Sequence, residues 1–359
     1  AFQLAMLGSS ADSAERFFES APIQALVADL GITGTFRGPR DAGTGYVHLY
    51  HAMGLATGVR GVWTFVRGGM GSVSGAIASA ARAAGAEIRT ATSVERVLVR
   101  EGRAYGVVTA RGEELHARAV LSNADPKRTY LRMVGERELP EDFARAVAAI
   151  KIESPVMKIN LALDGLPRFS SATRADQPDT SWACRGGISI APSIDFMQRA
   201  YEDARRGQPS DQPYMNVYAQ SAVDDTMAPP GKHILSIFAQ YFPYELADGG
   251  WETRREAVAD HVLARLGEYA PNVPGAVIAR QVLAPPDIEA RFGMTGGHIF
   301  HGELVPEQAF DLRPVPGSHA YEGPIRGLYL CGSGAWPGGC VMGAPGHNAA
   351  REAIGKLGA

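Results

Sequence analysis

The chain has 359 residues, of which 45% are hydrophobic and 20% are charged, and its formal net charge is −3. This balance is typical of a soluble globular protein with enough residues for two structural units. It argues against nucleic acid as the main partner, because neutralising phosphates requires clustered Lys and Arg, and no apolar run approaches the ~20 residues of a membrane span.

The cysteine content and the first residues of the chain favour a reducing compartment. Cys184, Cys331 and Cys340 form no CxxC pair and cannot all be paired internally, which favours a reducing environment. The first ten residues, AFQLAMLGSS, lack the basic stretch of a signal peptide and do not begin with Met. We therefore expect a cytoplasmic protein, and a chain that is a piece of something longer.

The first sixty residues predict helices interrupted by glycine-rich turns. Residues 12–30 form one predicted helix, with Asp12 or Ser13 as its cap and Gly31 as its end. A second apolar segment, YVHLYHAMGLA, carries His48 and His51 at helical spacing. No carboxylate or cysteine lies nearby in sequence, so packed histidines are favoured over metal ligands, and no metal site is predicted.

Residues 63–126 follow a more regular pattern. A glycine turn, GGMG, leads into a small-residue helix, and β-rich runs with turns at residues 101–102 and 111–112 follow it. This order predicts an α/β unit that carries a β-meander. From residue 127 to about 323 we expect several strands and a few helices, including an amphipathic helix over residues 253–269, which indicates an antiparallel sheet with helices on one side.

The C-terminal stretch GLYLCGSGAWPGGCVMGAPGHNAA combines a short strand, a dense group of glycines and a helical pattern. If Val341 or Met342 begins the final helix, its first amide groups lack intrahelical acceptors and its positive dipole end points outward. Pro345 suits such a first turn. An anion or an electron-rich ring edge would be stabilised there, although glycine-rich loops also end strands for plain turn reasons.

The signatures of several other enzyme classes are missing. The sequence contains no G-x-S-x-G, no HExxH, no Walker G-x-x-x-x-G-K-[ST], and no G-x-G-x-x-G after an opening strand. These observations exclude the commonest hydrolase and nucleotide-binding motifs.

The terminal pattern LYLCGSG-x-x-PGG-x-VMGAPG-x-NAA resembles the flavin motif of the phytoene-desaturase-like FAD oxidoreductases, in the branch of pyridine nucleotide-disulphide oxidoreductase domain-containing proteins. GGMG, SVERV, VLSNADP and TGGHIFHGEL resemble other landmarks of that family, in the same order. The resemblance covers essentially the whole chain. The family's first βαβ unit, with its dinucleotide-binding glycines, would precede residue 1, so the chain corresponds to a C-terminal portion.

The resemblance implies a fold of α/β with α+β character. A partial FAD-binding domain, related to glutathione reductase, accompanies a substrate domain with a mixed or antiparallel sheet and helices. Residues 63–126 and 322–359 would belong to the FAD-binding domain, and residues 1–62 and 127–321 to the substrate domain. Leu328–Cys331 should then contact strands within residues 87–122.

The resemblance also implies cofactor contacts. Backbone at Val94 would meet the adenine end, and the CGSG turn would lie along the ribitol and diphosphate. The cofactor-binding residues implied are Val94, Gly332, Ser333, Gly334, Gly338, Gly339, Val341, Met342 and Gly343. Cys340 stands where the family commonly has Gly, and we interpret it as a small buried thiol.

Two histidines and one arginine complete the candidates. His298 and His301 flank Ile299–Phe300, so in an extended segment they would point to opposite faces and at most one would meet the flavin. Core or surface histidines are the default, and the alternative assigns His301 as the catalytic residue lining the substrate cavity. Arg313 could bind a carboxylate, although an Arg-Pro beside a strand is more often structural.

Two functions remain open from the sequence. The first is an FAD-dependent oxidoreductase, desaturase-like or amine-oxidase-like, that removes hydride from an apolar or amine small-molecule substrate. The second is a non-catalytic binding module without flavin. We expect FAD binding to be weak or absent in the chain alone, and we expect a homodimer or association with the missing N-terminal segment, because an uncovered sheet edge favours association.

Overall fold

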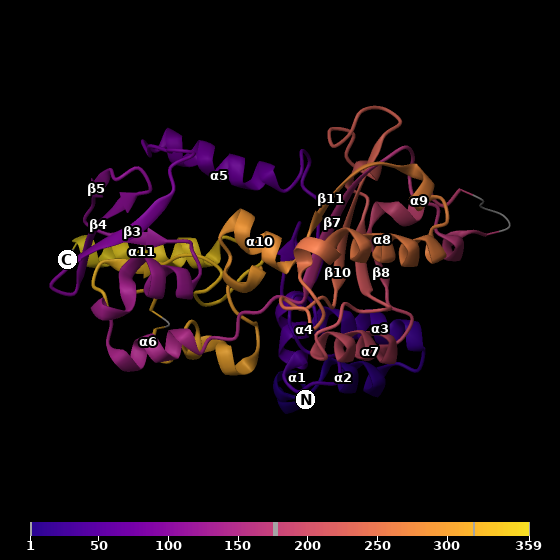
Figure 1. Cartoon of the computed structure of the whole chain (residues 1–359), viewed down its shortest axis with the longest axis horizontal. Coiled ribbons are helices and arrows are strands. Elements are labelled where there is room, and N and C mark those ends of the chain that lie inside the picture. Colours follow the sequence, from indigo (N-terminus) through magenta and orange to yellow (C-terminus); the bar gives the residue numbers. More distant parts are fainter. Residues whose placement is uncertain (1, 175–178, 319, 359) are drawn as a thin grey trace. The chain divides into compact units, whose positions relative to one another are not determined.

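The computed structural model describes residues 2–174, 179–318 and 320–358. It has mixed α/β architecture, and the chain divides into two compact units (Figure 1). Unit 1 comprises residues 1–88 and 155–285, and unit 2 comprises residues 89–154 and 286–359. These boundaries differ from the expected ones at 62, 126 and 321, and the assignment of the parts to cofactor and substrate stays a prediction.

A five-stranded antiparallel sheet forms the centre of unit 1. Its order is β11–β7–β10–β9–β8, and every neighbouring pair is antiparallel. The strands are β7 (Val156–Leu163), β8 (Gly187–Ile190), β9 (Tyr214–Tyr218), β10 (His233–Gln240) and β11 (Val277–Leu283). Strand alternation places Ile159, Ile237 and Val217 side by side, facing the core.

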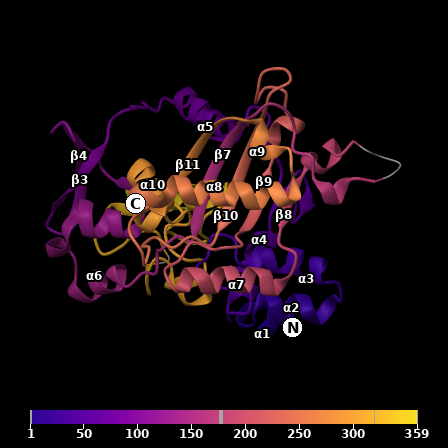
Figure 2. The same cartoon turned by 45° about the vertical axis from the view of Figure 1, so that its right-hand side comes forward.

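One face of this sheet is covered by α8 (Trp251–Tyr269), which runs across the strands in Figure 2. Its buried residues include Val258, Val262 and Leu266, so the amphipathic helix predicted over residues 253–269 is confirmed. α9 (Val273–Ala276) follows it. A second core joins the N-terminal helices to α7 (Ile194–Arg205), which the sequence analysis did not predict.

The N-terminal helices correct one prediction. Residues 12–30 do not form one helix: α2 (Ser10–Phe17), α3 (Ala21–Ala28) and a 3-10 turn at Asp29–Gly31 replace it, and a further helix, α1 (Phe2–Leu7), precedes them. Ser9 caps α2 in a capping box with Asp12. The break at residues 18–20 has a local cause, because Pro22 lacks an amide proton and can occupy only the first turn of a helix.

The rest of unit 1 comprises α4 (Thr44–Ala52), the short pair β1 (Leu55–Ala56) and β2 (Val59–Arg60), and α5 (Gly71–Ala83). On α4, His48 Nδ1 lies 2.8 Å from Val27 O and His51 Nδ1 lies 2.9 Å from Val47 O. Both histidines are packed against backbone, as predicted. Burial lowers the pKa of His51 to about 4, so its ring is neutral at physiological pH.

Unit 2 contains the predicted meander. β3 (Val94–Arg100), β4 (Arg103–Thr109) and β5 (Glu114–His116) pair antiparallel, and Glu101 and Gly102 turn between the first two with positive φ. β6 (Val120–Ser122) pairs in parallel with β12 (Leu328–Leu330). The expected contact between the last strand and the earlier segment is therefore confirmed.

Three helices complete unit 2: α6 (Glu141–Ala148), α10 (Pro285–Phe292), which begins at the boundary of the units, and α11 (Ala344–Gly358). A π-helical segment, Lys127–Gly135, follows β6. Tyr130 and Val147 share a core with Leu328 and Leu330. This core explains why residues 127–154 belong to unit 2 rather than to unit 1.

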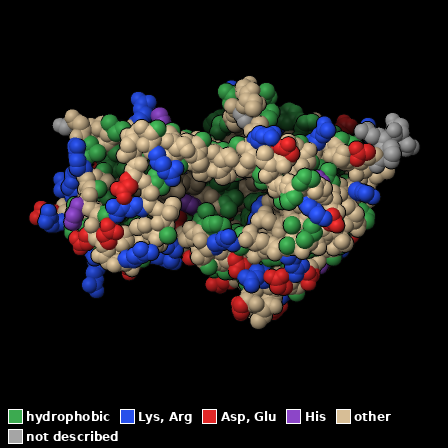
Figure 3. Space-filling view, turned by 90° about the horizontal axis from the view of Figure 1, so that it is seen from above, with side chains coloured by type: hydrophobic (Ala, Val, Ile, Leu, Met, Phe, Trp, Pro, Cys, Tyr) green, Lys and Arg blue, Asp and Glu red, His purple; other side chains and the backbone are tan. Residues whose placement is uncertain are grey.

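The surface carries charges of both signs. On the face shown in Figure 3, Lys and Arg side chains lie among Asp and Glu side chains. Many of them pair, for example Arg280 with Glu256 at 2.8 Å and Arg265 with Asp211 at 3.1 Å. Such exposed pairs contribute little to stability.

Candidate functional site

The C-terminal turn of unit 2 joins a buried strand to a long helix. Leu328, Tyr329 and Leu330 are at most 2% exposed, and Cys331 N donates to Ser122 O at 2.9 Å, which continues the pairing of β12 with β6. The residues after Cys331 leave the sheet in turns up to the start of α11. The strand, turn and helix predicted from the glycine pattern are all present.

Three of the predicted cofactor-binding glycines pack directly against protein. A Cβ on Gly332 would lie 2.3 Å from Asn123 Oδ1, and a Cβ on Gly334 would lie 2.6 Å from Pro126 Cδ. A Cβ on Gly339 would lie 2.4 Å from a ring carbon of Phe300. These glycines are therefore required by the approach of the turn to the segment 122–126 and to Phe300.

The remaining glycines serve backbone conformation. Gly338 has a φ of 110° and Gly343 a φ of 70°, which favour glycine because a side chain would strain the backbone. No atom lies within 4 Å of the position that a Cβ on Gly343 would take. Val341 and Met342 are 67% and 46% exposed. The end of the turn, in contrast to its beginning, borders open space.

Two expectations about this end of the turn are wrong. α11 begins at Ala344, not at Val341 or Met342, because the positive φ of Gly343 is incompatible with a helix. Pro345 lies in the first turn, as expected. Cys340 is exposed rather than buried, and its φ of 70° places it in the left-handed region.

Arg313 holds the turn in place. Its side chain is 2% exposed, and its guanidinium donates to the carbonyl oxygens of Ser333 at 2.7 Å, Glu303 at 3.1 Å and Gln308 at 3.3 Å. It also donates to Phe300 O at 2.5 Å. The structural role is therefore confirmed, because these acceptors are backbone carbonyls of two different segments.

The segment with the two histidines is folded into turns, not extended as expected. A 3-10 turn at Thr295–Gly297 precedes His298, and His301 has a φ of 55°. As a result both side chains are buried, at 0% and 8% exposure. The extended-strand argument that separated their faces does not apply here.

His301 meets the C-terminal turn. A Cβ on Gly334 would lie 3.5 Å from His301 Cβ, so the structure brings these two predicted residues together. Among the described residues, His301 Nδ1 and His298 Nε2 are buried without a hydrogen-bond partner. Burial lowers the pKa of His301, and burial lowers that of His298 to about 3, so both rings are neutral at pH 7.

Asp125 anchors the histidine segment from the other side. Its carboxylate is buried and accepts from the amide and hydroxyl of Thr295, at 3.0 and 2.8 Å, and from Arg128 N at 2.9 Å. The VLSNADP motif thus positions both the turn and the histidines. Val94 lies in the meander, at the start of β3, where it pairs with Thr109 and is 40% exposed, and its contact with the adenine end of FAD stays a prediction.

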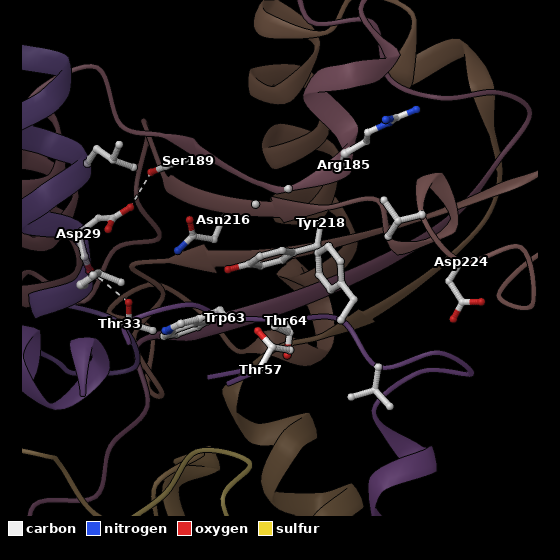
Figure 4. Close-up of a pocket in the computed structure, with 18 of the residues that line it drawn as sticks. Asp29, Thr33, Thr57, Trp63, Thr64, Arg185, Ser189, Asn216, Tyr218 and Asp224 are labelled. Carbon is white, nitrogen blue, oxygen red and sulfur yellow. Dashed lines mark hydrogen bonds between the residues drawn. The ribbon is translucent and has the colours of Figure 1, made fainter. Parts of the chain in front are cut away.

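Unit 1 contains a pocket that no sequence motif predicts. It measures about 810 Å³ and lies beside β8 and β9. Figure 4 shows Asp29 and Thr33 at one end, Asp224 and Arg185 at the other, and Tyr218 between them. No sequence signal identified it, because its walls come from four separate segments within residues 26–33, 57–67, 185–189 and 216–224.

One lysine of unit 1 lies on the face of the sheet opposite α8 and has a shifted pKa. Lys158 on β7 alternates with the core residues Met157 and Ile159, so it points away from α8. Burial lowers its pKa to about 8. Its neighbours on that face include Asn160, which is linked to Ser236 at 2.9 Å.

The described residues contain neither a candidate membrane-spanning helix nor a cluster of metal-ligating side chains. No helix in residues 2–174, 179–318 and 320–358 is long and apolar enough to span a membrane. Nor do three or more His, Cys, Asp or Glu within those ranges come together as metal ligands would.

Comparison with known proteins places these features in a family. Residues 8–354 match the model for flavin containing amine oxidoreductases. The mouse pyridine nucleotide-disulfide oxidoreductase domain-containing protein 2 is 44% identical over 345 residues, which cover 95% of this chain and 59% of that protein. The lycopene-forming phytoene desaturase of a Paracoccus species is 23% identical over 263 residues, covering 73% of this chain and 49% of that protein. The chain thus spans under two thirds of the length of these relatives.

Solved structures share the fold. A putrescine oxidase variant made in a redesign of cofactor binding superimposes with a TM-score of 0.58 at 17% identity, covering all of this chain and 69% of its own. Cyclohexylamine oxidase from Brevibacterium oxydans gives 0.53 at 16% identity, covering 99% and 69%. At this identity the likeness concerns the fold alone. The match over residues 8–354 confirms the resemblance predicted from the sequence, and this chain belongs to the flavin containing amine oxidoreductase family.

Proposed function

We propose that this chain forms the flavin-edge and substrate-binding parts of an FAD-dependent oxidoreductase that withdraws hydride from a small organic molecule. Family membership supports the flavin. The observation that carries the proposal is the end of the C-terminal turn, where Val341, Met342 and Gly343 border open space directly before α11.

α11 supplies the electrostatics of this site. Its first amides have no acceptor within the helix, and 15 residues align their peptide dipoles toward that end. Pro345 removes one of the unpaired donors without cost. FAD, when bound, accepts the hydride, and the helix end would stabilise the negative charge that the reduced ring gains.

His301 is the residue that we assign to the reacting side. It packs on Gly334, is neutral at pH 7, and keeps Nδ1 buried without a partner. Such a nitrogen can accept or donate one hydrogen bond to a bound molecule. His298 is the structural member of the pair, because its Nδ1 accepts from Phe300 N at 3.2 Å.

The packing of the turn supports weak FAD binding by the chain alone. Three glycines of the turn, Gly332, Gly334 and Gly339, pack closely against other residues of the chain. This packing alone explains why these positions are glycine, without any contact to a phosphate. Only the last residues of the turn, Val341 to Gly343, are therefore open to the flavin, and the turn does not form a complete phosphate-binding site. Few contacts must then offset the cost of ordering a large flexible ligand.

Association with another protein segment is a further part of the proposal. β6 and β12 form a two-stranded parallel sheet, whereas parallel sheets are usually covered on both faces. Leu121 of β6 is 40% exposed and Ile354 of α11 is 70% exposed. We propose a homodimer or a docked chain segment here, and light scattering after size-exclusion chromatography would distinguish either from a monomer.

Location in the cytoplasm is also proposed. Cys184, Cys331 and Cys340 are free thiols, as expected in a reducing compartment. Cell fractionation with an antibody against the chain tests it.

Anaerobic reduction of bound flavin tests the function. The chain is mixed with excess FAD and then with amines, alcohols or polyenes, and bleaching of the flavin absorbance is followed. We expect one class to bleach the flavin, and we expect His301→Gln to slow bleaching far more than His298→Gln. Neither FAD binding nor bleaching by any class, even with FAD in excess, would instead support the non-catalytic binding module without flavin.

A further inference from the structure

The pocket of unit 1 combines one buried carboxylate with an aromatic wall. Asp29 is only 4% exposed, yet it lines the pocket. Its Oδ2 accepts from the hydroxyl of Ser189 at 2.8 Å, and its carboxylate also accepts from the hydroxyl of Tyr214 (Figure 4 shows the Ser189 contact). Asn216 Nδ2 in turn donates to the oxygen of Tyr214. The carboxylate is therefore held rigidly at one end of the cavity.

The second feature of this carboxylate is that it lacks a cationic partner among the residues that the structure describes. Within residues 2–174, 179–318 and 320–358, no Lys, Arg or His forms an ion pair with Asp29. Buried carboxylates are normally paired with a cation or a metal, because taking an isolated charge out of water is costly. Burial raises the pKa of Asp29 to about 6, so the group is nevertheless mostly ionised at neutral pH.

Aromatic rings stand beside it. Trp63, Phe65 and Tyr218 all line the pocket. Phe65 and Tyr218 meet edge to face with centroids 6.2 Å apart, and Trp63 Nε1 donates to His51 O at 3.2 Å, which fixes the indole. Faces of Trp and Tyr attract cations and are used to recognise ammonium groups.

At the end of the pocket opposite Asp29, the charged side chains of Arg67 and Asp224 have partners. Arg67 pairs with Asp225 at 2.8 Å, and Asp224 accepts from Gly68 N at 2.7 Å and from Thr226 Oγ1 at 2.6 Å. In Figure 4, Arg185 and Asp224 lie at the end opposite Asp29. The uncompensated negative charge is therefore at the Asp29 end.

We propose that this pocket binds an organic cation, an ammonium group on an apolar body, with Asp29 as its counter-ion and Trp63 and Tyr218 as its aromatic walls. The ammonium group would supply the positive counter-charge that the Asp29 carboxylate lacks. The apolar body would lie along Phe65 toward Val223. This inference goes beyond the proposed function, because binding in unit 1 requires neither FAD nor turnover.

Isothermal titration calorimetry with benzyltrimethylammonium tests the site, with benzyl alcohol as the uncharged probe. We expect the cation to bind the wild-type chain more tightly than the alcohol. Asp29→Asn should weaken cation binding by at least about tenfold while leaving the alcohol unchanged. Trp63→Leu should weaken it roughly fivefold. Asp225→Asn, which removes an exposed carboxylate near the far end, should have little effect.

The pH dependence gives a test that needs no variant. Cation binding should weaken as pH falls through about 6, where Asp29 becomes protonated. The titratable groups around the pocket are Tyr214 and Tyr218, whose pKa values burial raises, His51, whose pKa burial lowers to about 4, and Asp224, whose pKa the hydroxyl of Thr226 lowers. Lys158, whose pKa burial lowers to about 8, lies on the same face of the sheet as Asn216, and the charged groups Arg67 and Arg185 also line the pocket. None of the five groups with a shifted pKa titrates near 6. Equal binding of the two probes, or cation binding indifferent to pH and to Asp29→Asn, would overturn the proposal.

Discussion

The C-terminal turn of unit 2 and the pocket of unit 1 are built in opposite ways. The turn is a continuous stretch of sequence whose glycines pack on neighbouring protein, with only its last residues open. The pocket has walls from four segments that are distant in sequence, around one buried carboxylate. A dense motif can thus owe most of its glycines to packing, whereas a site without any motif can hold a buried carboxylate that forms no ion pair among the described residues.

If the turn is held chiefly by internal packing, the largest effect should come from Arg313→Met. Several backbone carbonyls, including those of Ser333 and Glu303, would lose a buried donor. We expect the free energy of unfolding to fall by about 3–5 kcal/mol, as when a buried charge network is broken. Urea denaturation measures it, with Arg145→Met as the control, because that side chain is 72% exposed. An Arg313 variant as stable as the control would show that the turn needs no such clamp.

Gly334→Ala tests the internal packing of the turn by adding a single methyl group. Its Cβ would lie 2.6 Å from Pro126 Cδ, so the turn or the 122–126 segment must move. We expect a loss of about 2–3 kcal/mol in the free energy of unfolding. The matched control is Gly355→Ala within α11, where no atom lies within 4 Å and alanine should stabilise the helix by up to about 1 kcal/mol. Equal effects of the two substitutions would contradict the packing account.

For the pocket, Asp29→Asn should increase stability. Because the folded pKa is raised from 3.8 to about 6, the wild-type protein loses stability as pH rises through that window and carries the whole penalty above it. We expect the Asn variant to be more stable by about 2 kcal/mol above pH 6, with the difference vanishing below pH 4. Thermal melting at several pH values measures this. A destabilised variant at pH 8 would mean that the hydrogen bonds from Ser189 and Tyr214 outweigh the burial penalty.

Lys158→Met should have a smaller effect of the same sign. The pKa of Lys158 is lowered from 10.5 to about 8, so the wild-type penalty is complete below pH 8 and is relieved as pH rises toward 10.5. Because the side chain is only partly buried, we expect a gain of about 1 kcal/mol at pH 7. Denaturation at pH 7 and pH 10 tests it beside the exposed Lys151→Met. A gain that persists unchanged at pH 10 would not come from the ammonium charge.

The sequence predicted those features whose determinants are neighbours along the chain. The meander follows from alternating β-rich runs and two glycine turns, and α8 from its apolar period of Val258, Val262 and Leu266. The strand and helix around the C-terminal glycines were found in the same way. The start of α11 was misplaced, because nothing local reveals that Gly343 takes a φ of 70°.

Features that depend on tertiary contacts were not predictable. His298 and His301 are both buried because a turn at Thr295–Gly297 folds their segment. The carbonyls that satisfy Arg313 lie up to 20 residues away from it. Asp29 appears in the sequence as an ordinary acidic residue near a helix end, and only the folded chain brings it beside Ser189, Trp63 and Tyr218.

FAD binding to two variants of the turn tests the central claim most directly. Gly343→Pro would force a φ near −65° where the chain needs 70°, and it would disturb the backbone just before α11. Met342→Ala removes only an exposed side chain. Flavin fluorescence titrations, with melting curves to show that both variants are folded, should give about tenfold weaker FAD binding for Gly343→Pro and a nearly unchanged affinity for Met342→Ala. Equal losses in the two variants, or unchanged affinity in both, would contradict a flavin site formed by the backbone at the end of this turn.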